Sequence, residues 1–204
     1  MVADNIVEPK RAYELGKRLE QMDQSRAAIL RAARTQLEAK GYRQLTMSSL
    51  AAESGVTRQT VHNLFGTKAA VLEALFDVIA LDGGVENMRD VMTHPSAETM
   101  LERFIELFCH FWAKNRLLLR RIHGIGAIDP EFGAVIEARN RRRLTAAARI
   151  VSRIGVRKQL EQRAATLAAL TSFEFFDALH EGSLDGNRAA AIVLDLARKM
   201  LTEN

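Results

Sequence analysis

Apolar side chains recur every three to four positions along most of this chain, a spacing typical of helices that bury one face. The first such segment starts at Ser25, which can cap a helix that ends before Gly41. Its inward positions are Ala28, Ile29, Ala32, Ala33, Gln36 and Leu37. Shorter helices are predicted from Thr46, over residues 57–64, and from Thr67 until two glycines at 83 and 84 interrupt the pattern.

Beyond residue 85 the predicted helices are longer and cover residues 97–113, 116–123, 130–154, 157–181 and 187–202. Glycines at 124 and 126 predict a break, and Asp129 followed by Pro130 predicts a new helix start. A second break is predicted over residues 182–186. Residues 1–24 fit either a weak amphipathic helix or a frayed tail. The whole pattern predicts an all-α protein.

The composition supports an all-α protein and excludes several other classes of protein. The 204 residues include only 3 prolines and 12 glycines, and the 48% of hydrophobic residues can fill a substantial core. A single cysteine, Cys109, excludes an internal disulfide framework and any Cys-rich zinc site. The sequence has no secretion signal and no apolar run that could span a membrane, so we expect a cytoplasmic protein with no membrane partner.

A helix-turn-helix is the most specific feature of the pattern. Ala51, Gly55 and Val61 have the spacing that two short helices need around a tight turn. The small Ala51 lets the second helix pass close, and Gly55 can adopt the left-handed conformation that ends the first helix. Val61 turns inward and holds the two helices together.

The second of these helices is then predicted to face a DNA groove. It would present Thr57, Arg58, Gln59, Thr60, His62 and Asn63. Residues 25–72 also carry seven Lys or Arg against two acidic residues, the excess expected of a module that contacts phosphates.

The same region resembles the TetR family of transcriptional regulators. The matching elements are Ser25-Arg26-x-x-Ile29-Leu30-x-Ala32-Ala33, Gly41-Tyr42 and Thr46-x-x-x-Leu50-Ala51-x-x-x-Gly55-Val56-Thr57-x-x-Thr60-Val61-x-x-x-Phe65-x-x-Lys68-x-x-Val71-Leu72. The resemblance implies an extension over 1–24, a three-helix DNA-binding domain over 25–70, and an effector-binding and dimerisation domain over 71–204. It also implies a homodimer on a near-palindromic operator, a repressor released by a small, largely hydrophobic effector.

The resemblance further implies roles for single residues. Thr46 and Ser48 would meet phosphates at a helix N-terminus, and Lys68 would lie against the DNA backbone. Arg58 and Gln59 are the candidates for base edges, because arginine pairs bidentately with guanine and glutamine with adenine. Two positions depart from the family pattern: His62 stands where tyrosine is usual, and Leu64 where an aromatic or histidine is common.

The aromatic stripe of residues 97–113 fits either plain core or the wall of a ligand pocket. The candidate pocket residues are Phe104, Phe108, Phe111, Trp112, His123, Phe132, Asn140, Arg143 and Phe173. Asn140 and Arg143 interrupt an apolar face, so they either meet a polar or anionic part of the ligand or the helix is rotated so that Leu144 points inward.

Several alternatives remain open. Small and apolar residues over 157–181 and 187–202 predict a homodimer through a four-helix bundle. The protein could instead be an effector-independent or architectural DNA binder. Catalytic constellations, cofactor motifs and the spacing of metal ligands are absent from the sequence, so no enzyme, cofactor or metal is expected. In the N-terminal extension, Lys10, Arg11, Lys17 and Arg18 either add DNA contacts or have no specific role.

Overall fold

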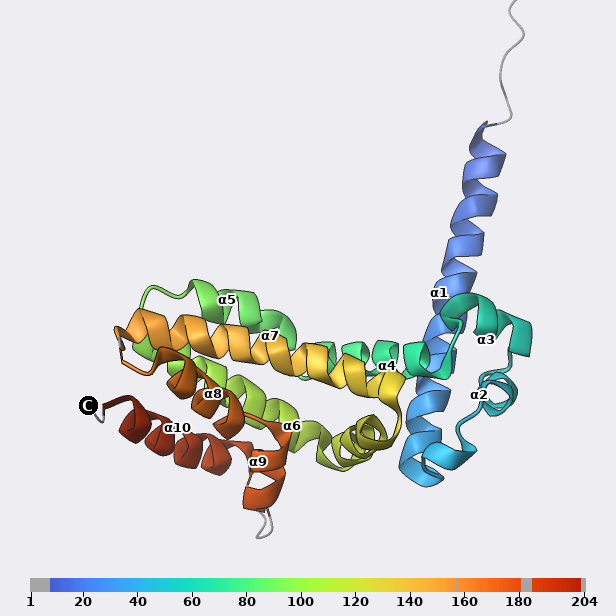
Figure 1. Ribbon diagram of the computed structural model, residues 1–204. Helices are drawn as coiled ribbons and strands as arrows, with labels where there is room; N and C mark the ends of the chain where they lie inside the picture. Colours follow the sequence, from blue (N-terminus) through green and yellow to red (C-terminus); the bar gives the residue numbers. More distant parts are fainter. Residues whose placement is uncertain (1–7, 157, 181–184, 203–204) are drawn as a thin grey trace, which may run out of the picture. The chain divides into compact units, whose positions relative to one another are not determined.

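The computed structural model describes residues 8–156, 158–180 and 185–202, which form ten α-helices, two short 3-10 helices and no strand (Figure 1). This confirms the all-α prediction. The chain divides into two compact units, Met1–Leu75 and Phe76–Asn204. None of the described helices combines the length and the apolar character that a membrane span requires.

The first unit is a small helical domain. It contains α1 (Glu8–Ala39), a 3-10 helix (Tyr42–Gln44), α2 (Met47–Ser54), α3 (Arg58–Phe65) and the first half of α4 (Lys68–Asp82). α1 packs against both α2 and α3. Fully buried side chains in this unit are Ile29, Ala33, Leu37, Leu45, Leu50, Val61, Val71 and Leu72.

α1 begins much earlier than predicted. It runs without interruption from Glu8, so Ser25 lies in its middle and caps nothing. Of the two alternatives for residues 1–24, the helix is therefore correct from Glu8 onward, and residues 1–7 lie outside the described residues. The reason is local: Pro9 sits in the first turn, where proline is tolerated, and residues 17–24 are mostly good helix formers.

The second unit is a bundle of longer helices. After the end of α4 come a 3-10 helix (Val85–Asn87), α5 (Met88–Thr93), α6 (Ala97–Ile128), α7 (Pro130–Ile154), α8 (Leu160–Leu170), α9 (Phe173–Leu179) and α10 (Gly186–Thr202). α6 packs against α7 on one side and α10 on another, and α7 also packs against α8 (Figure 1). The turns between residues 85 and 93 are helical pieces that the sequence pattern did not predict.

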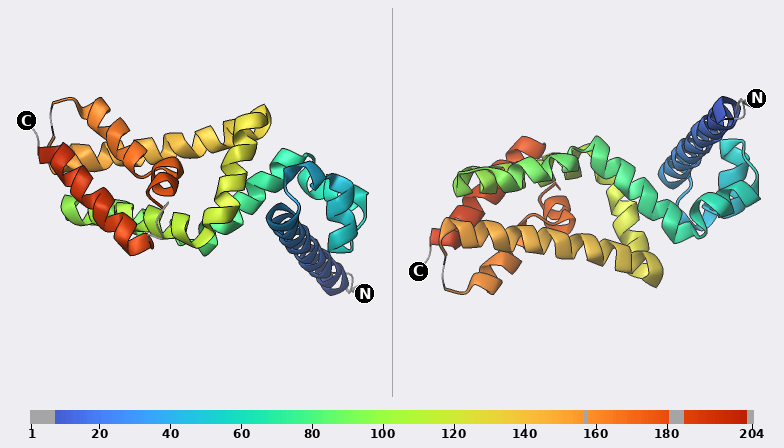
Figure 2. Two further views of the ribbon diagram at one scale, coloured as in Figure 1. Left: turned by 90° about the horizontal axis from the view of Figure 1, so that it is seen from below. Right: turned by 90° about the horizontal axis from the view of Figure 1, so that it is seen from above.

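α6 contains both pieces that the sequence predicted, residues 97–113 and 116–123, and it bends between them. Its direction changes at Asn115, which has φ −121° and ψ 15°, and the bend is plain in Figure 2. The buried Asn115 amide donates to the Phe111 carbonyl at 3.3 Å, competing with the backbone for that acceptor. Gly124 and Gly126 continue the helix, so the predicted break there is wrong.

Gly126 has a packing role in that helix. A Cβ built on Gly126 would lie 3.0 Å from the Ile136 side chain, and one on Gly133 would lie 2.6 Å from the Gly126 carbonyl oxygen. The ends of α6 and α7 therefore come so close that a side chain at Gly133 would clash with backbone, and one at Gly126 would press on the Ile136 side chain. Packing at this contact outweighs the cost of about 1 kcal/mol for a glycine inside a helix.

Other predicted helix ends are confirmed. Asp129 caps α7 by accepting the Phe132 N–H at 3.1 Å with Pro130 in the first turn, and Gly155 ends α7 in the left-handed region. The predicted helix over 157–181 is wrong, because it breaks at Thr171 into α8 and α9. Ser172 caps α9 by accepting the Phe175 N–H. Within the predicted break over 182–186, residues 182–184 lie outside the described residues.

The contact between α6 and α7 gives a stability prediction. Gly133→Ala places a methyl group 2.6 Å from a backbone oxygen, so we expect the free energy of unfolding to fall by about 1–3 kcal/mol. Gly124→Ala is the matched control, because nothing lies within 4 Å of its Cβ and alanine favours helix. Urea denaturation followed by circular dichroism measures both. Equal stability of the two variants would contradict the close contact.

Candidate nucleic-acid interface and interior cavity

α2 and α3 form the helix-turn-helix that the sequence predicts. Gly55 ends α2 with φ 70°, and its N–H donates to the Ala51 carbonyl. Ala51 and Val61 are both buried. Thr46 begins α2 with a reciprocal cap: its hydroxyl accepts the Ser49 N–H at 3.0 Å, and the Ser49 hydroxyl accepts the Thr46 N–H at 2.9 Å. The geometry of the turn is thus set by local signals.

α3 presents a polar, exposed face. Thr57 caps it by accepting the Thr60 N–H at 3.0 Å, which leaves Arg58, Gln59, His62 and Asn63 exposed. The Gln59 amide donates to Asn63 Oδ1 at 2.8 Å, and the Thr57 and Thr60 hydroxyls are 2.8 Å apart. All six predicted recognition residues, Thr57, Arg58, Gln59, Thr60, His62 and Asn63, therefore lie on or at the start of one short helix.

The three predicted phosphate-contact residues lie at helix starts. Thr46 and Ser48 are exposed at the beginning of α2. Lys68 begins α4, and its ammonium lies 3.5 Å from the centroid of the Tyr42 ring. The ring thereby holds the lysine side chain near the surface of the unit.

A buried glutamine joins α1 to α2, a contact that the helical pattern does not reveal. Gln36 is only 2% exposed; its amide donates to Glu53 at 2.8 Å and its carbonyl oxygen accepts from the Ser49 hydroxyl at 2.8 Å. The sequence pattern counted Gln36 as an inward position but gave no indication of its partners. Since Ser49 also belongs to the cap of α2, Gln36 fixes that cap against α1.

A groove of about 960 Å³ lies beside α3 within the first unit. Its walls are the middle of α1 and the turn and outer face of the helix-turn-helix, namely Arg18, Leu19, Gln21, Met22, Ser25, Gly55, Val56, Thr57, Thr60, Asn63 and Leu64. Residues 18–25 of α1 thus border the predicted recognition helix.

The second unit encloses a smaller cavity of about 270 Å³. Six of the nine predicted pocket residues line it: Phe108, Phe111, Trp112, His123, Asn140 and Arg143. Phe104, Phe132 and Phe173 do not line this cavity. Phe104 and Phe132 are fully buried in the core, and Phe173 packs its ring against Trp112 and His123 from outside the wall.

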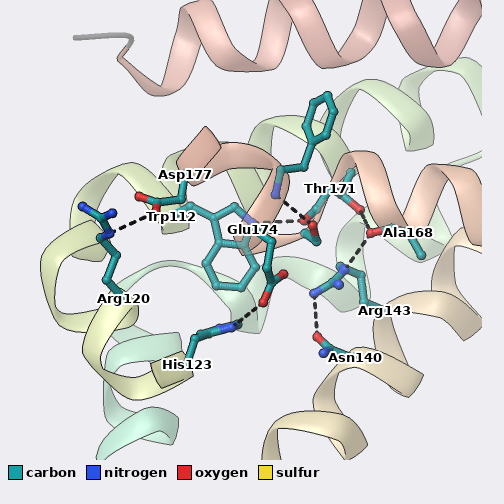
Figure 3. Close-up of polar contacts among 11 residues, drawn as sticks. Trp112, Arg120, His123, Asn140, Arg143, Ala168, Thr171, Glu174 and Asp177 are labelled. Atoms are coloured by element: carbon teal, nitrogen blue, oxygen red, sulfur yellow. Dashed lines mark hydrogen bonds and ion pairs between the residues drawn. The ribbon is translucent and has the colours of Figure 1, made fainter. Parts of the chain in front are cut away.

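The orientation of α7 settles which of its side chains faces inward. Arg143 is 8% exposed and Leu144 is 40% exposed, so the rotated alternative is wrong. The Arg143 guanidinium donates from Nε to the Ala168 carbonyl at 3.2 Å and from Nη1 to Asn140 Oδ1 at 3.0 Å (Figure 3). Burial lowers the pKa of Arg143, and the charge of Glu174 opposes that effect.

His123 and Glu174 form a pair beside the cavity. His123 Nδ1 and Glu174 Oε1 are 2.8 Å apart, joining α6 to α9 (Figure 3). The hydrogen bond from His123 lowers the pKa of the Glu174 carboxyl to about 2, so the carboxylate accepts and Nδ1 carries the proton. The other ring nitrogen, Nε2, is buried and has no hydrogen-bond partner among the described residues.

The sequence pattern missed the contribution of α4 and of four further α7 residues, Ala146 among them. Phe76, Asp77 and Ala80 line the cavity from α4, and Ile136, Arg139 and Arg142 line it from α7, together with Val85, Met88 and Ala146. The pattern correctly predicted that Phe76 is buried. It gave no reason to place Phe76 in the same cavity wall as Trp112. Asp77 pairs with Arg139, and periodicity alone carries no information on such a pair.

The single cysteine is inert in this setting. Cys109 is buried in α6, and burial raises the pKa of its thiol to about 12. His110 on the same helix is hydrogen-bonded to Asn187 of α10. Neither residue belongs to the cavity.

The helix-turn-helix geometry agrees with a match to a known family. Residues 29–75 match the family model described as bacterial regulatory proteins, tetR family. Residues 29–75 thus match a TetR-family DNA-binding domain, and the matched region covers α2, α3 and the residues around Thr46, Arg58 and Lys68.

Solved structures extend the likeness to the whole TetR fold. A TetR-like regulator from Rhodococcus sp. RHA1 is 20% identical with a TM-score of 0.67, covering 88% of this chain and 97% of that one. A TetR regulator from Haloarcula marismortui is 18% identical with a TM-score of 0.67, covering 88% and 96%. A proposed regulator from Saccharomonospora viridis, in complex with choline, is 18% identical with a TM-score of 0.63, covering 86% and 96%. At these identities the likeness establishes the fold, and no curated protein matches the sequence.

The Gln36 contacts predict a specific loss of stability in the TetR-like DNA-binding unit. Gln36→Leu removes both hydrogen bonds and leaves Glu53 without this partner, so we expect the free energy of unfolding to fall by about 1–3 kcal/mol. Gln24→Leu, at an exposed position of the same helix, should change it by less than about 0.5 kcal/mol. Urea denaturation measures both, and equal effects would show that the Gln36 bridge contributes nothing.

Proposed function

We propose that this TetR-family regulator is a homodimeric repressor that binds a near-palindromic operator and is released by a small, largely hydrophobic effector. The observation that carries the proposal is the exposed polar face of α3, built on a rigid turn, in a chain whose second unit encloses a cavity lined mainly by apolar residues. The first feature suits base readout and the second suits a small ligand.

The proposed DNA contacts divide into base readers and phosphate contacts. Arg58 and Gln59 are the proposed base readers, because their side chains are exposed at the N-terminal end of the recognition helix. Thr57, Thr60, His62 and Asn63 would complete the face in the groove. Thr46, Ser48 and Lys68 would contact phosphates, where helix starts favour an anion.

Homodimerisation through α8 and α10 is supported by an exposed apolar strip. Of the small and apolar residues on these two helices, Ala164, Leu167, Ala190, Val193 and Ala197 are buried inside the protomer. On α10, Ile192 and Leu196 remain exposed, and Ala165 and Ala169 are exposed on the adjacent α8. Two copies could bury this strip in a four-helix bundle, and a two-fold axis would match a near-palindromic site.

Effector control would use α4. This helix carries Lys68 in its first turn and Phe76, Asp77 and Ala80 further along, where the last three line the cavity. A ligand that displaces those residues would act directly on the helix that begins with a proposed phosphate contact. The alternative, an effector-independent or architectural DNA binder, predicts that no small molecule changes DNA affinity.

The DNA proposal is tested by Arg58→Ala. Fluorescence anisotropy against duplex DNA from upstream of its own gene, with excess competitor DNA, should show tight binding by the natural protein. Loss of a bidentate base contact costs about 1–3 kcal/mol per site, so we expect at least about tenfold weaker binding in the variant. Repeating the titration at two salt concentrations separates this loss from phosphate contacts, which depend on salt.

Arg103→Ala is the control for that experiment, because Arg103 is an exposed arginine on α6 in the other unit. It should bind the same DNA as tightly as the natural protein. Weak binding that is erased by salt and equal in all three proteins would contradict sequence-specific recognition by α3.

The dimer proposal is tested by Leu196→Glu. A charge in the exposed strip of α10 would have to be buried unpaired in the proposed bundle, so the variant should sediment as a monomer where the natural protein sediments as a dimer. Leu117→Glu is the control, since Leu117 on α6 is 72% exposed and lies outside the strip. A Leu196→Glu dimer as stable as the control dimer would remove α10 from the interface.

A further inference from the structure

The polar residues that line the cavity are mostly basic. Arg139, Arg142 and Arg143 reach it from α7, and Asp77 reaches it from α4. Asp77 forms an ion pair with Arg139, and Arg142 is exposed, so the buried positive charge of the wall is that of Arg143. Glu174, which does not line the cavity, offsets part of this charge from the His123 side. The interior therefore has a positive potential that favours an anionic guest.

Two of the aromatic rings that line the cavity, Phe76 and Phe108, already lie beside arginines. The Arg143 guanidinium already lies 5.7 Å from the Phe108 ring centroid, and that of Arg139 lies 4.5 Å from the Phe76 centroid. A quaternary ammonium ligand would have to displace these arginines from the ring faces and accept their repulsion. The same rings still offer apolar surface to the uncharged part of a ligand.

Arg143 is held in a fixed orientation with donors to spare. Its bonds to the Ala168 carbonyl and to Asn140 use two of the five N–H groups of a guanidinium. These two contacts, from α8 and from its own helix, hold the planar group without neutralising it. A carboxylate or sulfonate could accept from the remaining N–H groups in the bidentate manner that arginine favours.

His123 offers a second polar atom to the same space. Its Nδ1 is taken by Glu174, its ring lies against Trp112 and Phe173, and its buried Nε2 has no partner among the described residues. A protonated ring would donate from Nε2 to an acidic group of the ligand. Because His123 and Arg143 both line the cavity and both lie near Glu174, one acidic group could be bound by both (Figure 3).

We propose that the cavity binds a small organic anion: a carboxylate or sulfonate on a flat apolar body, with the acidic group held by Arg143, Asn140 and His123. The volume of about 270 Å³ lies just below the usual range of about 300–1,000 Å³ for ligand pockets, so the body is short. This proposal rests on the proposed function in one respect: it takes this cavity as the site that binds the effector.

The test compares two probes that share one ring system. 8-Anilinonaphthalene-1-sulfonate is an anion, and N-phenyl-1-naphthylamine is its neutral counterpart. Trp112 lines the cavity and is the single tryptophan of the chain, so energy transfer from it to either probe reports binding to the full-length protein. We expect the anionic probe to bind the natural protein at least about tenfold more tightly than the neutral one, the effect of one charge-assisted hydrogen bond or more.

Arg143→Gln should lower the affinity for the anionic probe by about tenfold or more, because it removes the charge. The affinity for the neutral probe should change by less than about twofold, because glutamine keeps a polar side chain at this position. Arg141→Gln is the matched control: the same substitution on the same helix, at an exposed residue paired with Glu137. It should change neither affinity. If Arg143→Gln does not fold, His123→Gln provides the second variant, and it should also weaken only the anionic probe.

The outcomes separate the ligand class from the proposed function. Equal affinity of the natural protein for both probes would overturn the anion site while leaving the cavity as an effector site. Tighter binding of choline than of the anionic probe would also overturn it. A parallel loss of both probes in Arg143→Gln would show that Arg143 only supports the cavity wall. If neither probe binds the natural protein, the effector cavity itself fails.

Discussion

The close approach of α6 to α7 is the contact on which the second unit depends. At Gly133 the backbone of α7 lies against the Gly126 carbonyl oxygen of α6, and the Ile136 side chain packs against Gly126. This fixes the last turns of α6 against the first turns of α7. His123 precedes the contact and Asn140 follows it, so both helices present polar side chains to the same cavity. A wider separation would enlarge that space and move those groups apart.

In each unit a buried polar side chain connects two helices. Gln36 joins α1 to the capped start of α2, and Arg143 joins α7 to the end of α8. In both cases hydrogen bonds to fixed partners offset the cost of removing the group from water. The two residues differ in their remaining hydrogen-bonding capacity. The Gln36 amide nitrogen and oxygen both have protein partners, whereas Arg143 retains its charge and further N–H donors. The first is therefore a structural bridge, and the second has capacity for a ligand.

Local signals in the sequence predicted helix starts and ends well wherever a single residue sets the backbone conformation. Gly55 in the left-handed region, the caps at Thr46 and Thr57, and the Asp129 start of α7 all behave as their residue types indicate. Ser25 failed as a cap because nothing before it stops the helix, and the glycines at 124 and 126 failed as a break because packing outweighs propensity there. The cavity was predicted only in part. Its α4 wall depends on which helices meet in space, and periodicity within one helix contains no such information.

The hydrogen bond between Gln59 and Asn63 affects how a preference for a different operator sequence could evolve in this protein. The two amides already satisfy one another on the exposed face of α3, one turn apart. If α3 reads bases as proposed, each amide is oriented by the other before DNA arrives, and the pair forms one recognition element. Replacing either residue alone would free its neighbour to rotate. A new operator preference would then be reached through coordinated changes at both positions, which makes single substitutions poor intermediates in its evolution.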